Sequence, residues 1–127
     1  MTEAAFLLDS NICIYVLADA QCRAARRLGA CEPGSVVTSA IVYAEVLRGI
    51  VDHGAAAIDQ YNRFFRRIPV VPFDQSAAYV YHSIPFKRGK FDRLIAGHAL
   101  SLGLTLVTNN TEDFADVPGL RIENWTL

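Results

Sequence analysis

The stretch Ala4–Asp9, with the sequence AAFLLD, is a short apolar run that ends in a carboxylate. A continuous apolar run of this length is typical of a strand buried on both faces of a parallel sheet. The segment that follows, residues 11–18, is rich in apolar side chains and predicts a short helix. We therefore expect a β-strand and an α-helix that meet at Asp9.

The same alternation continues along the chain. Further strands are expected at 36–38, 68–73, 105–108 and 120–122, and further helices at 20–30, 40–48, 55–67, 77–84 and 91–100. Strands that alternate with helices at this spacing predict right-handed crossovers between parallel strands. The expected fold class is α/β, a three-layer α/β/α sandwich with a central, mainly parallel sheet of four to five strands. A chain of 127 residues favours a single domain over residues 1–127.

Local signals predict where several of these elements begin and end. Ser39 is expected to cap the helix at 40–48, and Gly49 is expected to end it. Thr111 is expected to cap a last short helix. Pro69 and Pro72 place the strand at 68–73 on an edge of the sheet, because proline cannot donate a hydrogen bond to a neighbouring strand.

Four acidic residues lie where this fold delivers side chains to one rim. Asp9 follows the first strand, and Glu45, Asp92 and Asp113 lie near the starts of three helices. Ligands of parallel sheets bind beyond the carboxyl ends of the strands, where these helices begin. Two carboxylates about 4 Å apart repel by roughly 4 kcal/mol at an effective dielectric near 20. A pocket that gathers them is therefore expected to hold a divalent cation, Mg²⁺ or Mn²⁺.

A metal-activated water could hydrolyse a phosphodiester without a side-chain nucleophile. On this hypothesis Asp9 and Asp92 are the principal metal ligands and Glu45 is a ligand or the activator of the attacking water. Asp113 is an outer ligand. The four acids are thus the predicted catalytic residues of a metal-dependent nuclease.

Neighbouring polar residues are expected to assist. Asn110 offers an amide oxygen, while Asn11 and Ser39 are expected to position water or phosphate by hydrogen bonding. A group of basic residues brackets Asp92 and is expected to hold an RNA backbone beside the metal: Lys87, Arg88, Lys90 and Arg93.

Each acid also has a purely structural interpretation. Glu45 is three residues before Arg48, a spacing typical of a surface ion pair on a helix. Asp92 and Asp113 suit the first turn of a helix, where an anion is favourable, and Asp9 suits a helix cap. Four independent caps need not converge on one pocket, so their joint placement favours the metal site.

Charge and cysteine content narrow the class of protein. Lys and Arg number 12 against 13 Asp and Glu, giving a formal net charge of -1, so no global positive field attracts a nucleic acid. The 3 cysteines form no C-x-x-C pair and suggest reduced thiols in the cytoplasm. No apolar run reaches the roughly 18 residues that cross a bilayer, so no membrane partner is expected.

Five blocks of the sequence resemble the same protein family: Leu7–Ile12, Thr38–Val46, Asp92–Leu100, Leu106–Phe114 and Val117–Trp125. Together they resemble PIN-domain proteins, and most of all the VapC toxins of type II toxin-antitoxin systems. The resemblance implies a PIN-like fold and a Mg²⁺- or Mn²⁺-dependent endoribonuclease that cuts an essential RNA. It also implies a homodimer and a VapB-type antitoxin whose tail binds in a groove.

The resemblance has departures, and other functions compete with it. Ser10 stands where the family often has threonine, Val42 replaces a frequent hydroxyl residue, and the fourth acid is open between Asn110 and Asp113. A phosphatase of the haloacid-dehalogenase kind would need an aspartate where Asn11 stands. A non-catalytic binding module with the PIN fold is the other alternative.

Overall fold

A computed structural model describes residues 3–88 and 90–127 of the chain. Its centre is a five-stranded sheet with the order β3-β2-β1-β4-β5, in which every neighbouring pair is parallel. The strands are β1 (Phe6–Leu8), β2 (Val36–Ser39), β3 (Val70–Val71), β4 (Thr105–Val107) and β5 (Ile122–Glu123). The predicted parallel sheet is confirmed, and the proline-flanked strand β3 lies on an edge as expected.

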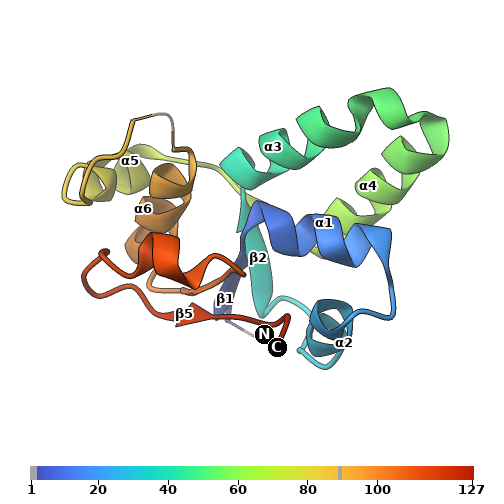
Figure 1. Cartoon of the computed structure of the whole chain (residues 1–127), viewed down its shortest axis with the longest axis horizontal. Coiled ribbons are helices and arrows are strands. Elements are labelled where there is room, and N and C mark those ends of the chain that lie inside the picture. Colours follow the sequence, from blue (N-terminus) through green and yellow to red (C-terminus); the bar gives the residue numbers. More distant parts are fainter. Residues whose placement is uncertain (1–2, 89) are drawn as a thin grey trace.

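Six helices connect the strands within the described residues. They are α1 (Ser10–Ala18), α2 (Arg23–Gly29), α3 (Ala40–Ile50), α4 (Ala55–Arg67), α5 (Gln75–Tyr81) and α6 (Asp92–Leu102), with short 3₁₀ turns η1 (Val51–His53) and η2 (Thr111–Phe114). Figure 1 shows α5 and α6 on one side of the strands and α1, α3 and α4 on the other. This is the predicted three-layer sandwich. None of the described helices is long and apolar enough to span a membrane.

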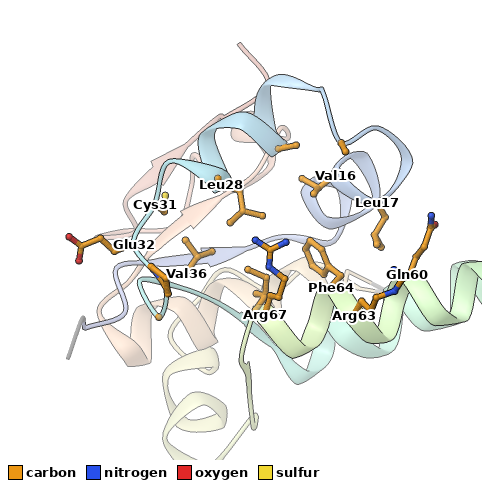
Figure 2. A pocket seen from close by; sticks show the side chains of 16 residues that line it. Val16, Leu17, Leu28, Cys31, Glu32, Val36, Gln60, Arg63, Phe64 and Arg67 are labelled. Atoms are coloured by element: carbon orange, nitrogen blue, oxygen red, sulfur yellow. The ribbon is translucent and has the colours of Figure 1, made fainter.

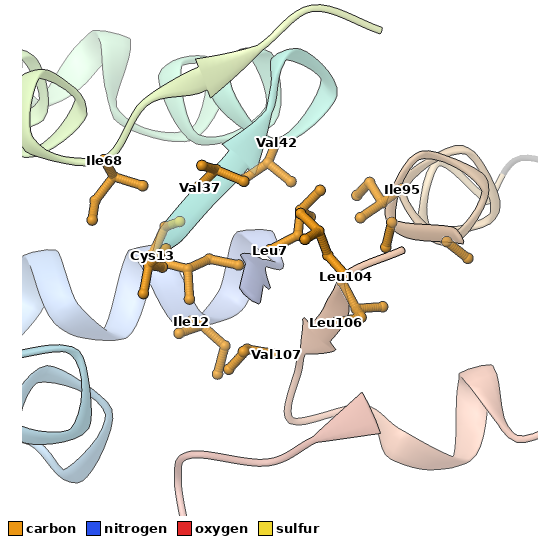
Figure 3. Close-up of a cluster of buried hydrophobic side chains, with 14 of the residues drawn as sticks. Leu7, Ile12, Cys13, Val37, Val42, Ile68, Ile95, Leu104, Leu106 and Val107 are labelled. Atoms are coloured by element: carbon orange, nitrogen blue, oxygen red, sulfur yellow. The ribbon is translucent and has the colours of Figure 1, made fainter. Parts of the chain in front are cut away.

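The core lies where both helical layers meet the central strands. Leu7 of β1 and Leu106 of β4 are fully buried. Figure 3 shows them together with Ile12 of α1 and Ile95 of α6. Gly97 is needed for the contact between α5 and α6, because a Cβ atom there would lie 3.1 Å from the backbone of α5. The burial predicted for the first strand is confirmed at Leu7 and Leu8 of β1.

The helix end predicted at Gly49 and the helix cap predicted at Thr111 are both wrong. Gly49 lies inside α3, which continues to Ile50 because that side chain packs against the core. The chain turns only at Gly54, whose φ of 96° suits a residue without a Cβ. Thr111 is the first residue of η2 rather than its cap, and no side chain caps that turn.

The strand order reverses between β1 and β4, and we call the region at the carboxyl ends of these two strands the crevice. From β1 the chain moves outward to β2 and β3, and it then returns to add β4 on the opposite side of β1. At such a reversal the connections leave the sheet toward opposite faces, which opens a ligand crevice at the carboxyl ends of the two strands. Asp9 directly follows β1, and Thr108 directly follows β4.

Candidate metal centre

Asp9 bridges the two strands that flank this crevice. Its Oδ1 accepts a hydrogen bond from the Ser10 backbone N–H at 2.8 Å, which caps α1. Its Oδ2 accepts one from the Thr108 hydroxyl at 2.8 Å. The residue is only 6% exposed. The predicted cap and the predicted rim position are therefore both present at Asp9.

Glu45 reaches the same place from the second turn of α3. The Ser10 hydroxyl donates to Glu45 Oε1 at 2.6 Å. Among the described residues Glu45 makes no ion pair with Arg48, so the surface-pair interpretation does not hold. A serine that follows Asp9 directly thus ties the first acid to the second.

Asp92 is the first residue of α6, and one of its carboxylate oxygens has no partner. Within the described structure Asp92 Oδ1 is buried and accepts no hydrogen bond. A buried acceptor without a donor costs free energy, on the order of 1–3 kcal/mol or more for a charged group. A cation bound to this oxygen would remove that free-energy cost.

The pKa of Asp9 shows that the three acids interact. Burial raises the pKa of the Asp9 carboxyl above its ordinary value, and the negative charges of Glu45 and Asp92 raise it further. The hydrogen bonds from Thr108 and Ser10 act in the opposite direction. The structure therefore brings Glu45 and Asp92 close enough for their charges to disfavour the ionised form of Asp9.

The fourth acid lies on the neighbouring loop. Asp113 is exposed in η2 and is not among the charges that shift the pKa of Asp9. Residues 109–113 line a small hollow of about 260 Å³ beside the end of β4. The Asn110 backbone N–H donates to the Thr108 hydroxyl at 3.1 Å. Asn110 and Asp113 thus both remain candidates for an outer ligand.

The two remaining auxiliary residues differ in their surroundings. Ser39 is fully buried, and its hydroxyl is engaged by the Ile41 N–H at 3.1 Å and by His98 Nδ1 at 2.8 Å. The prediction that Ser39 positions water or phosphate is therefore corrected, because its role is to cap α3. Asn11 is half-buried and donates to Asn109 Oδ1 at 3.3 Å.

The basic segment also needs one correction. Lys87, Arg88 and Lys90 are exposed, as a nucleic-acid contact requires. Arg93 has 0% exposure and donates to the Asp116 carboxylate at 3.0 Å and to the Asp113 backbone carbonyl. A guanidinium enclosed in this way cannot reach an RNA backbone, and it instead ties α6 to the segment after η2.

The residues of the crevice fit a hard cation in kind, although they are not drawn together around one point. Among residues 3–88 and 90–127, no group of three or more His, Cys, Asp or Glu side chains converges closely enough to hold a metal. Two Asp9 oxygens and one Glu45 oxygen are engaged by protein donors. Mutual repulsion between carboxylates favours separate positions for these side chains. The unpartnered Asp92 oxygen is the observation that points to a missing positive charge.

Sequence reasoning missed several residues that build the crevice. Thr108 holds Asp9, Ser10 holds Glu45, and Asn109 links Asn11 to the Tyr15 hydroxyl, to which it donates at 3.0 Å. The available signal was their position, since Ser10 follows the acid that comes after β1, and Thr108 and Asn109 are the first two residues after β4. Because Asn11 offers an amide rather than a carboxyl group, the crevice lacks the general acid that a haloacid-dehalogenase phosphatase requires.

A second concave surface lies away from the acids. It is an apolar hollow of about 840 Å³ between α1, α2, α4 and the start of β2. Figure 2 shows Val16, Leu28 and Phe64 among its lining, with Arg63 and Arg67 on the same helix as Phe64. This hollow combines a large apolar floor with three charged side chains, Glu32, Arg63 and Arg67, a composition suited to a peptide rather than to a metal ion.

Comparison with known proteins agrees with this geometry. The family model described as the PIN domain matches residues 6–120. The chain belongs to the PIN-domain family. It is 34% identical to the tRNA(fMet)-specific endonuclease VapC of Shigella flexneri, over 95% of this chain and 98% of that one. It is 31% identical to the Salmonella typhimurium protein of the same name, over 94% and 97% of the two chains.

Solved structures of similar proteins share the PIN fold of this chain. The structure of VapBC2 from Rickettsia felis bound to a DNA fragment from their promoter has a TM-score of 0.86 and 27% identity, covering 95% of this chain and 98% of that one. DNA-bound VapBC from Salmonella typhimurium has a TM-score of 0.83 and 30% identity, covering 96% and 98%. The PIN-like fold class expected from the sequence is confirmed.

Proposed function

We propose that this PIN-domain protein is a Mg²⁺- or Mn²⁺-dependent endoribonuclease and the toxin of a toxin-antitoxin pair. The carrying observation is the unpartnered, buried Oδ1 of Asp92 beside two further carboxylates, Asp9 and Glu45. VapC relatives named as endonucleases and ribonucleases support the reaction class. We further propose that residues 1–127 act as one nuclease domain.

In this mechanism the chain positions oxygen ligands and a water. Asp9 and Asp92 would hold the cation, and Glu45 would either bind it or orient the attacking water. A bound divalent cation would lower the pKa of that water and shield the charge of the phosphodiester. The Ser10 and Thr108 hydroxyls keep Glu45 and Asp9 in their observed rotamers.

The loop after β4 completes the proposed site. Asp113 or Asn110 would act as the outer ligand, because both lie on the hollow beside the end of β4. Lys87, Arg88 and Lys90 would neutralise phosphates of the RNA on either side of the cut. Arg93 contributes indirectly, since it fixes the Asp113 backbone relative to α6.

We also propose a VapB-type antitoxin and a second copy of the chain as partners. The similar solved structures are VapBC proteins. The apolar hollow between α1, α2 and α4 would take an antitoxin segment with apolar side chains and an acidic residue directed at Arg67. Coexpression with the neighbouring open reading frame should relieve growth arrest, and an Arg67→Glu toxin should escape that relief.

Cleavage of RNA tests the proposed activity. Purified protein should cut a hairpin RNA with an unpaired loop in Mg²⁺ or Mn²⁺, and EDTA should abolish the cut. Asp9→Asn and Asp92→Asn should each lower kcat at least about a hundredfold, as expected when a charge-stabilising group of the site is removed. Asp52→Asn, an exposed acid outside the crevice, is the matched control and should retain full activity.

Two results would contradict the proposed function. Activity that survives EDTA would exclude the metal mechanism, and full activity of Asp92→Asn would exclude the site. A protein that binds RNA with an intact crevice and never cleaves it would be the non-catalytic binding module.

A further inference from the structure

Two phenylalanine rings project into solvent from the connection between α5 and α6. Phe86 is 71% exposed and Phe91 is 60% exposed. Large aromatic side chains usually contribute to a core, so two exposed rings in one short segment indicate a binding surface. The residues between and beside them include three exposed cations, Lys87, Arg88 and Lys90.

This segment is anchored directly beside the proposed metal site. Phe91 immediately precedes Asp92, and its carbonyl accepts the Leu94 N–H at 3.0 Å in the first turn of α6. The Phe91 ring therefore starts one residue from the unpartnered carboxylate.

An ion pair and a backbone hydrogen bond hold the basic residues near the same end of α6. Lys87 Nζ lies 3.8 Å from the Asp116 carboxylate, which also pairs with buried Arg93. The Lys90 carbonyl accepts the Arg93 N–H at 3.1 Å. Phe91, Lys87 and Lys90 thus lie at the end of α6 that carries Asp92.

We propose that Phe86 and Phe91 form a stacking platform for unpaired bases next to the scissile phosphate, with Arg88 and Lys90 contacting the backbone. Aromatic side chains interleaved with cations are how proteins bind single-stranded nucleic acid, because every base has a face that stacks. In a duplex those faces are already covered by neighbouring bases. The platform, which rests on the proposed ribonuclease function, therefore selects RNA loops and single strands over duplex RNA.

The charge of the segment favours RNA over a second copy of the chain. The buried centres of protein interfaces are depleted in lysine, whereas this segment has three cations within five residues. A polyanion with exposed aromatic bases matches both features of the surface. A protein partner would bury the two rings, but it would also remove water from the cations beside them, which is unfavourable.

Matched substitutions separate stacking from general apolar contact. Phe86→Leu and Phe91→Leu keep an apolar side chain without a ring face, whereas Phe→Trp at each position keeps the face. Tyr79→Leu on α5 is the control, since Tyr79 is 72% exposed but its ring already contacts the His82 ring at an interplanar angle of 58°. All of these rings are exposed, so we expect the variants to melt within about 2 °C of the parent.

Binding is measured by fluorescence anisotropy with a labelled unpaired RNA and a matched duplex, in EDTA to prevent cleavage. Each leucine variant should weaken binding of the unpaired RNA about tenfold, in line with the loss of one base–aromatic stack, and the tryptophan variants should bind like the parent. Duplex affinity should not change. In Mg²⁺ the same leucine variants should raise KM more than they lower kcat.

Several outcomes would overturn the platform. The first is that the leucine variants bind unpaired RNA as tightly as the parent. The second is that they lose affinity for duplex RNA as much as for unpaired RNA. The third is that the Phe86→Leu and Phe91→Leu double variant dissociates a dimer in sedimentation but keeps its RNA affinity. If the parent cleaves RNA and the leucine variants cleave it equally well, the platform fails while the proposed function stands. If the parent neither binds nor cleaves RNA, both fail.

Discussion

Replacing Asp9 by asparagine should stabilise the protein when no metal is present. Two carboxylates about 8 Å apart repel by roughly 2 kcal/mol at an effective dielectric near 20. Glu45 and Asp92 both repel the Asp9 carboxylate, and we assign each repulsion this order of magnitude. Removing both repulsions gains roughly 4 kcal/mol, while the amide weakens two charge-assisted hydrogen bonds by about 1 kcal/mol each. The net gain is on the order of 2 kcal/mol, which for a domain of this size raises Tm by roughly 5–10 °C.

The gain should depend on pH with a definite sign. Burial and neighbouring charges raise the pKa of the Asp9 carboxyl in the folded protein. The native state therefore takes up a proton before the unfolded chain does, so acidification relieves the cost of ionised Asp9. The advantage of the asparagine variant should be full at pH 7.5 and should shrink as the pH falls through the folded pKa and below the ordinary value of 3.8.

Thermal unfolding with EDTA and with Mg²⁺ provides the assay. In EDTA the Asp9→Asn variant should melt above the parent, and Asp59→Asn, an exposed acid paired with Arg63, should not. Saturating metal at about a hundred times its Kd should add about 2.7 kcal/mol to the parent and much less to the variant, which narrows or reverses the difference. A clear fall in Tm for Asp9→Asn in EDTA would mean that Asp9 acts chiefly as the cap of α1.

Substitutions at Ser10, Gly97 and Asp116 test three other features of the molecule. Ser10→Ala should lower kcat for RNA cleavage about tenfold, because it removes one hydrogen bond that orients Glu45. Ser10→Thr keeps the hydroxyl and should retain activity. Equal rates for the two variants would mean that the hydroxyl does not contribute to catalysis. Gly97→Ala should lower the free energy of unfolding by about 1–3 kcal/mol in a urea titration, because the new Cβ meets the backbone of α5. Gly49→Ala is the helical control. Because open space surrounds Gly49, this substitution should raise the free energy of unfolding by roughly 0.5–1 kcal/mol. The hydrogen bond from Arg93 lowers the pKa of Asp116. Its contribution to the stability of the folded protein is therefore fully present above the ordinary carboxyl pKa, and it is lost as the pH falls through the lowered pKa. Asp116→Asn should therefore lower Tm at pH 7 and have little effect near pH 2, and an equal loss at both pH values would exclude the ion pair as its cause.

The elements with strong local signals were predictable from the sequence. The apolar run before Asp9 predicted a buried strand, and β1 occupies most of it. The helix expected at 91–100 corresponds to α6, which ends at Gly103 in the left-handed conformation with a φ of 69°. The edge position of β3 followed from the prolines around it. These features depend on neighbours along the chain, which a sequence displays directly.

The failures concern residues whose role depends on distant contacts. Ser39 has the sequence signature of a cap and also of a phosphate contact, and only the buried neighbour His98 decides between them. Arg93 follows a basic loop in sequence, yet it is enclosed against Asp116 from a segment 23 residues away. Gly49 was expected to end a helix that the packing of Ile50 extends.

The candidate site lies between these cases. The three acids that interact were each predicted from their positions at strand ends and helix starts. Their supporting hydroxyls, Ser10 and Thr108, were not assigned roles, because a sequence does not reveal which carboxylate each hydroxyl will face. Hydrogen bonds across 35 and 99 residues link them to Glu45 and Asp9.

The most direct test of the account is the anomalous diffraction signal of Mn²⁺ in crystals of the parent protein and of Asp92→Asn. We expect a peak between Asp9, Glu45 and Asp92 in the parent, with the Asp92 oxygen as a ligand, and a much weaker peak in the variant. A parent crystal without manganese in that crevice, from protein that cleaves RNA in the same buffer, would contradict the account.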